Sequence, residues 1–167
     1  IESLAWHTSD YNSTDGPSWY CGFEDIGTGS PGYLDAWVQY LDSPSFTVPA
    51  AGTMTADMWW GLEDPAGAVV AGTCTDGWDQ ANVQISIDGG ETFSMLTGSI
   101  DYDFGCGYGM VYNGFECGSD GGLGGPNNGD CPGWGGYSDG WQNVSFDLSA
   151  YAGEDAVVRF AFYSDPA

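Results

Sequence analysis

The sequence contains no lysine, and Arg159 is its one strongly basic residue, beside a single histidine, His7. Against these stand 24 acidic residues, which give a formal net charge of −23 at pH 7. Such a surface repels phosphate backbones and anionic lipid headgroups, so the charge argues against nucleic acid and membranes as partners. Cations are the partners that it favours. A surface that is acidic only for solubility explains the same composition, and both interpretations stay open.

The scarcity of histidine also bears on catalysis. A nucleophilic triad needs a positioned base, and a zinc peptidase of the H-E-x-x-H type needs paired imidazoles, whereas His7 is alone. Two carboxylates can hydrolyse a glycosidic bond, but among 24 acids close pairs arise by chance. We therefore expect a protein that is not an enzyme.

Long hydrophobic runs and helical patterns are missing as well. No apolar run approaches the roughly 20 residues of a membrane helix, and no segment places apolar residues at i, i+3, i+4 and i+7 over three turns. The 167 residues, 42% of them hydrophobic, suffice for one domain with a core. We expect a single domain over 1–167, without membrane insertion; the absence of a signal peptide before Ile1 predicts a mature form or an excerpt of a longer chain.

Cysteine is present without the spacing of a zinc site. There is no C-x-x-C pair, so disulfides are the better interpretation of the five residues Cys21, Cys74, Cys106, Cys117 and Cys131. We expect at least two bridges, with one local bridge inside 106–131 and a second from Cys21 to Cys74. Disulfides place the protein in an oxidising compartment, so we expect it to be extracellular.

The clearest local pattern is a β-hairpin over residues 83–96. Val83, Ile85 and Ile87 alternate with polar residues, which predicts a half-buried strand. Asp88-Gly-Gly90 supplies a reversing turn, and Phe93 and Met95 continue in a second strand.

Similar alternation predicts strands elsewhere, at residues 1–6, 33–41, 46–48, 53–60, 141–148 and 156–163. Residues 105–140 hold 14 of the 28 glycines, so neither a helix nor a long strand is expected in this insertion.

Residues 1–17 are expected to form a flexible or strand-donating arm. Arg159 should pair with a neighbouring acid. The prediction is an all-β fold of two antiparallel sheets packed face to face.

Four stretches in this order resemble the MAM-like jelly-roll module of secreted prokaryotic proteins, including the module attached to immune-inhibitor-A-type metallopeptidases. They are 18–22 leading to 41–44, 76–79 leading to 83–90, 146–153, and 158–165. The resemblance implies an extracellular jelly-roll sandwich that often holds calcium and serves in binding, adhesion or domain packing.

Modules of this family usually continue into a closing strand, whereas this chain stops at Ala167. Either the remainder lies elsewhere or another subunit supplies a strand by β-augmentation. In the second case residues 1–6 are the natural donor, and head-to-tail exchange yields filaments.

Calcium prefers six to eight oxygen ligands from carboxylates and carbonyls on turns. The candidate ligands are Asp76 and Asp79, which flank a glycine, Glu24 and Asp25 after the Trp-Tyr-Cys-Gly cluster, and Asp165 after the last strand. For each of them, a solvated or turn-capping role is the alternative.

Adjacent Trp59 and Trp60 must face opposite ways in a strand, which leaves one of them free to stack on a sugar ring. Two functions remain. The first is a structural or adhesive module whose partners are other copies of itself or neighbouring domains. The second is a carbohydrate-binding accessory domain of a secreted hydrolase, with glycans as partners.

Overall fold

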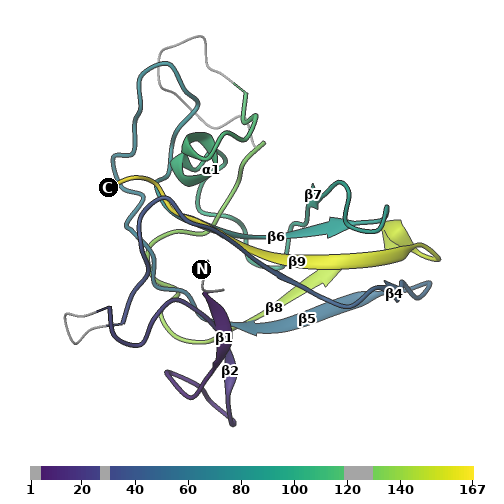
Figure 1. Ribbon diagram of the computed structural model, residues 1–167. Coiled ribbons are helices and arrows are strands. Elements are labelled where there is room, and N and C mark those ends of the chain that lie inside the picture. Colours follow the sequence, from purple (N-terminus) through teal and green to yellow (C-terminus); the bar gives the residue numbers. More distant parts are fainter. Residues whose placement is uncertain (1–4, 27–30, 119–129) are drawn as a thin grey trace.

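The computed structural model describes residues 5–26, 31–118 and 130–167, and its regular secondary structure is almost entirely antiparallel strands (Figure 1). The expected all-β class is therefore confirmed. The elements in chain order are β1 (Trp6–Ser9), β2 (Ser18–Cys21), β3 (Val38–Asp42), β4 (Phe46–Thr47), β5 (Thr53–Met58), β6 (Gln80–Ser86), β7 (Ser94–Met95), α1 (Tyr108–Tyr112), β8 (Gln142–Asp147), η1 (Ser149–Tyr151) and β9 (Asp155–Tyr163).

The central sheet has the strand order β3-β9-β6-β7, and β4 pairs with the start of β9. Phe160 of β9 lies opposite Leu41 on one side and Val83 on the other. The hairpin predicted at 83–96 is present as β6 and β7, although β7 is only two residues long. Asp88 accounts for the wide turn, because its carboxylate accepts the backbone N–H groups of Glu91 and Thr92 at 3.0 and 2.9 Å.

A second sheet, β5–β8, faces the first across a hydrophobic core. Val144 and Phe146 of β8 are fully buried, and Met54 lies opposite Phe146 on the inner face. Burial of these rows gives the core, which also contains Val83, Ile85, Val158 and Trp134. The predicted face-to-face packing of antiparallel sheets agrees with this arrangement.

The polar face of β6 departs from the prediction of a half-buried strand. Gln80, Asn82 and Gln84 are at most 5% exposed, whereas Ile87, expected on the apolar face, is 49% exposed beyond the end of the strand. The amides are satisfied inside the protein: Gln80 Nε2 donates to the Cys131 carbonyl at 2.9 Å, and Gln84 Nε2 donates to the Tyr163 hydroxyl at 2.9 Å. The sequence pattern of alternating polar and apolar residues is the same whether the polar face of the strand is exposed to water or covered by a second buried layer.

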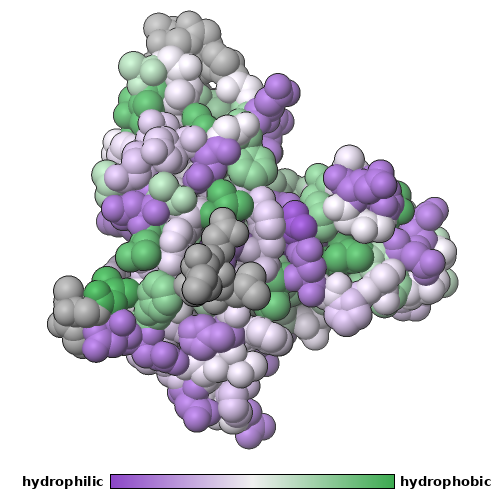
Figure 2. All heavy atoms as spheres, in the orientation of Figure 1, coloured by the Kyte–Doolittle hydropathy of each residue, from purple (hydrophilic) through white to green (hydrophobic). Residues whose placement is uncertain are grey.

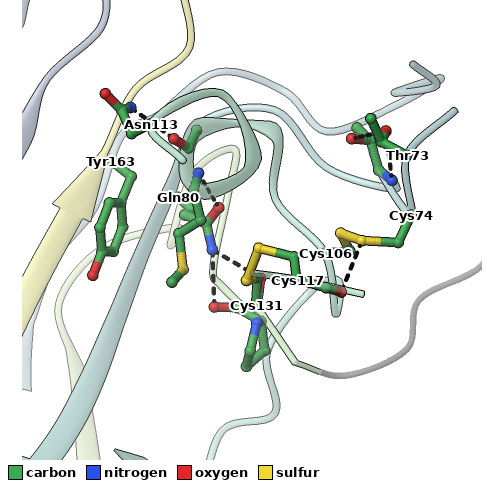
Figure 3. The surroundings of a disulfide bond; sticks show 12 residues. Thr73, Cys74, Gln80, Cys106, Asn113, Cys117, Cys131 and Tyr163 are labelled. Atoms are coloured by element: carbon green, nitrogen blue, oxygen red, sulfur yellow. Dashed lines mark hydrogen bonds between the residues drawn. A yellow bond between two sulfur atoms is a disulfide. The ribbon is translucent and has the colours of Figure 1, made fainter. Parts of the chain in front are cut away.

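The glycine-rich insertion supplies that second layer (Figure 3). Disulfides Cys74–Cys106 and Cys117–Cys131 hold it, which confirms two bridges and the local bridge inside 106–131. The predicted Cys21–Cys74 bridge is wrong, because Cys74 is bonded to Cys106 and Cys21 is a free thiol in β2. Loop residues 74 and 106 both lie on the outer side of β6, while Cys21 belongs to the separate β1–β2 hairpin.

The insertion also contains α1, which the sequence did not predict. Two glycines allow this short helix to press on the sheet: a Cβ at Gly107 would lie 1.8 Å from Gln80 Oε1, and one at Gly109 would lie 2.6 Å from the Tyr163 carbonyl oxygen. Glycine is needed here for close approach. Residues 119–129 of the insertion lie outside the described residues.

Hairpin β1–β2 stands at the end of β5, far from α1 (Figure 1). Of the strand expected at 1–6, residues 1–4 lie outside the described residues, and the observed strand β1 begins only at Trp6. Arg159 pairs with Asp42 through two hydrogen bonds of 2.7 and 2.8 Å, as expected. Among the helices that the structure describes, none has the length and hydrophobicity to cross a membrane.

Candidate metal centre and aromatic cavity

Three carboxylates converge at one end of the central sheet, where β6 begins and β9 ends. Oxygen atoms of Glu63, Asp79 and Asp165 all lie within 4.8 Å of one another. Asp79 and Asp165 are each 4% exposed, while Glu63 is exposed. Two of the three, Asp79 and Asp165, are among the calcium ligands predicted from the sequence.

Strand pairing explains why these two meet. Asp79 precedes β6 and Asp165 follows β9, and the antiparallel register places Gln80 opposite Tyr163. The backbone N–H of Asp165 donates to Asp79 Oδ1 at 2.8 Å, which fixes the pair. Glu63 comes from the loop after β5, where its carbonyl accepts the Gly136 N–H at 2.8 Å.

Burial and mutual repulsion disfavour the charged state of this cluster. Burial raises the pKa of Asp79, and the charges of Asp165 and Asp35 raise it further. Hydrogen bonds from the Asp165 N–H and the Tyr33 hydroxyl oppose this rise. Burial raises the pKa of Glu63 too, and the charges of Asp79, Asp165 and Asp35 add to the effect.

No basic side chain is left to neutralise these charges. Arg159 is paired with Asp42, and His7 lies 3.5 Å from Glu24. Since the sequence has no other basic residue, the charges of this cluster are compensated either by protonation of a carboxyl group or by a bound cation. A hard cation fits the donor set, because carboxylate oxygens on loops are the ligands that calcium prefers.

The other predicted ligands lie elsewhere. Asp76 Oδ1 accepts the Cys106 backbone N–H at 2.8 Å, which ties the loop before β6 to the insertion. Glu24 accepts the Ser9 hydroxyl at 2.5 Å, and this bond, together with His7, lowers its pKa. Asp25 follows Glu24 and is exposed, outside the group of three. Glu63, the third carboxylate of the group, was not predicted as a ligand from the sequence.

A cavity of about 660 Å³ opens between hairpin β1–β2 and the end of β5. Aromatic side chains dominate its wall: Trp6, Tyr11, Trp19, Tyr20, Tyr33, Trp59, Trp60, Tyr137, Trp141, Phe160 and Phe162. Trp19 and Tyr137 are 58% and 76% exposed. The Trp141 indole N–H donates to the Asn12 carbonyl at 3.0 Å and so links the hairpin loop to this wall.

Both predicted ligand-binding tryptophans line this cavity. Trp60 is stacked on Trp134 with ring centroids 5.2 Å apart and belongs to the edge of the core. Trp59 and Tyr137 lie against Gly61, where a Cβ would come within 3.1 Å of Trp59 and 3.4 Å of Tyr137. The neighbouring Cys21 thiol also lines the cavity, and burial raises its pKa to about 12, so it stays protonated at neutral pH.

Comparison of the chain with protein-family models, with curated proteins and with solved structures gives no match.

Proposed function

We propose that the chain is a non-enzymatic extracellular module with a structural or adhesive role, folded as a calcium-stabilised jelly roll of the MAM-like kind, and that copies of it assemble by strand addition. Two disulfides support an oxidising, extracellular setting. The observation that carries the proposal is the open edge of the second sheet.

That edge belongs to β5. Among the described residues β5 pairs only with β8, so its other side presents backbone donors and acceptors without strand partners. Natural edge strands are usually protected by Lys, Pro or a bulge, and β5, Thr-Met-Thr-Ala-Asp-Met, carries a single charge at Asp57.

The inner row of β5 supports the same interpretation. Met54, Ala56 and Met58 face the core, yet all three remain half-buried. The corresponding row of β8, Val144 and Phe146, is fully buried. An added strand on β5 would cover the methionines and extend a sheet of only two strands, which is the usual result of β-augmentation.

The proposed donor is the N-terminal segment of a second copy. Its residues 1–6 alternate in the way a strand requires. Within one copy, Ala5 donates its N–H to Gln39 Oε1 of β3 at 3.2 Å, and Trp6 begins β1. Residues 1–4 lie outside the described residues, so their role rests on the sequence pattern. Donation from each copy to the next forms open chains.

Calcium is the proposed stabiliser of the end of the sandwich where the loop after β5, the start of β6 and the end of β9 meet. Without a cation, buried like charges oppose folding there. With one, the three segments are held together, and the loop that follows β5 is fixed to the central sheet.

Sedimentation velocity over a concentration series, in calcium, tests the assembly. The full chain should form larger species as concentration rises, whereas a variant lacking residues 1–6 should remain monomeric. A synthetic peptide of residues 1–10 should bind the truncated variant, and a peptide of the same composition in scrambled order should not. A full chain that stays monomeric at millimolar concentration, or a truncated chain that still assembles, would refute strand addition.

A further inference from the structure

We propose that the aromatic cavity between hairpin β1–β2 and the end of β5 binds a neutral pyranose sugar chain. This is a binding activity beyond the assembly proposed above. It rests on the cavity's dimensions and rings, on two unpaired buried donors, and on the charge of the protein.

The rings of the wall suit the apolar faces of sugars. A volume of about 660 Å³ lies in the range of small-molecule sites and accommodates a few pyranose units. Trp19 and Tyr137 are largely exposed, and Trp59 and Trp141 stand further in, half-buried. Flat aromatic faces stack on the C–H faces of pyranose rings while hydroxyl groups remain free for hydrogen bonds.

Two indole N–H groups of the same wall lack acceptors. Trp6 Nε1 and Trp60 Nε1 are buried, and neither has a hydrogen-bond partner within the described part of the chain. Both residues line the cavity. A buried donor without an acceptor carries a desolvation cost. Neither nitrogen is open to the cavity in this structure, so the inference includes a small shift of the wall on binding, after which an oxygen of the ligand accepts the N–H and removes that cost. Trp134, whose Nε1 donates to the Asp101 carbonyl at 3.0 Å, shows the satisfied alternative in the same cluster.

Charge and donor chemistry then select among ligands. The net charge of −23 disfavours uronic acids and sulfated sugars. A quaternary ammonium ion would suit the aromatic walls and the charge, but it offers no acceptor to the two indole N–H groups. A neutral sugar has both apolar faces and acceptor oxygens, so it satisfies every feature of the wall.

Titration of the calcium-loaded full chain with neutral hexasaccharides tests the inference. The probes are β-1,4-glucan, α-1,4-glucan and β-1,4-mannan hexamers, with a polygalacturonate hexamer as the anionic control, followed by tryptophan fluorescence and calorimetry. At least one neutral hexamer should bind, and the anionic control should not. Trp59→Ala should weaken that binding by about 10-fold or more, since a stacked aromatic ring contributes on the order of a tenfold change or greater.

Trp6→Phe and Trp60→Phe separate the N–H groups from the rings. Each should weaken binding by about 3-fold to 10-fold, the effect of one hydrogen bond, while leaving the melting temperature without sugar unchanged or higher. Trp78→Ala is the matched control, because Trp78 packs against Tyr108 outside the cavity; binding should be unaffected.

Absence of binding by all three neutral hexamers at 10 mM overturns the inference, as does binding that survives Trp59→Ala. The inference is also overturned if the tryptophan fluorescence changes only on assembly, or only when the peptide of residues 1–10 is added. In that case a strand of another copy occupies the cavity. If the protein assembles but binds none of the sugars, the sugar-binding inference fails and the proposed assembly stands. The two proposals are therefore tested separately.

Discussion

Removal of calcium should lower the stability of the protein through the Glu63, Asp79 and Asp165 cluster. Ligand binding to the native state stabilises it by RT ln(1 + [L]/Kd). Extracellular calcium modules have Kd values on the order of 10⁻⁴ M, so 10 mM calcium corresponds to about 100 Kd and about 2.7 kcal/mol. For a domain of this size each kcal/mol moves the melting temperature by about 2–4 °C. The expected loss in excess chelator is therefore about 5–11 °C.

Asp79→Asn distinguishes a specific site from general screening. Asp79 is buried beside two other acids, so neutralising it should leave the calcium-free protein equally stable or more stable. The same change should abolish most of the calcium response. Glu154→Gln removes one charge at an exposed turn and is the matched control. Thermal unfolding by circular dichroism with calcium, with magnesium and with chelator measures all of these.

Two results would refute the reasoning. The first is a melting temperature that chelator leaves unchanged, together with no calcium in elemental analysis of the native protein. The second is an Asp79→Asn variant that responds to calcium as strongly as Glu154→Gln does, because the response would then come from general screening of the acidic surface.

Three further predictions concern the same fold. Because the pKa values of Asp79 and Glu63 are raised, the calcium-free protein should lose stability as the pH rises from about 4 through those pKa values. The stabilisation by calcium should grow over the same pH window. Melting curves at pH 4.5, 6 and 7.5 check this, and a calcium effect that shrinks with rising pH contradicts it. Replacing both cysteines of the Cys117–Cys131 bridge by serine should cost about 3 kcal/mol for a loop of this length, measured by urea unfolding; a cost below about 1 kcal/mol would count against the insertion as a stapled layer. Gly107→Ala should destabilise the protein by about 1–3 kcal/mol through overpacking on Gln80, with Gly32→Ala as its control, because a Cβ at Gly32 would meet only the end of the Ile26 side chain, at 3.3 Å; equal stability of the two variants would contradict the close packing described.

Strand alternation predicted much of the fold, because the inner rows obey a period of two. Val144, Phe146 and Val158 lie in the core as expected. The second buried layer was not predictable, since Gln80, Asn82 and Gln84 read as a solvent face until the insertion covers them. The helix α1 was hidden for a related reason: its glycines disfavour a helix locally, and tertiary packing on Tyr163 is what selects it.

The candidate metal centre shows the same limit. Asp79 was found because it and Asp76 flank a glycine, and Asp165 because it follows the last strand, but the register that brings the two together depends on long-range pairing of β6 with β9. Glu63 enters from a loop 16 residues before Asp79, and no local pattern marks it. The Cys21–Cys74 prediction failed in the same way, because sequence separation alone does not indicate which side of a sheet each cysteine occupies.

The central claim, strand addition at the open edge of β5, is tested most directly by amide hydrogen exchange in the monomeric and assembled states. The prediction is that alternate amides of Thr53–Met58 exchange quickly in the monomer and become protected on assembly, while the amides of β6, which has a strand on each side, remain equally protected in both states. Assemblies in which the β5 amides exchange as quickly as in the monomer would contradict the account.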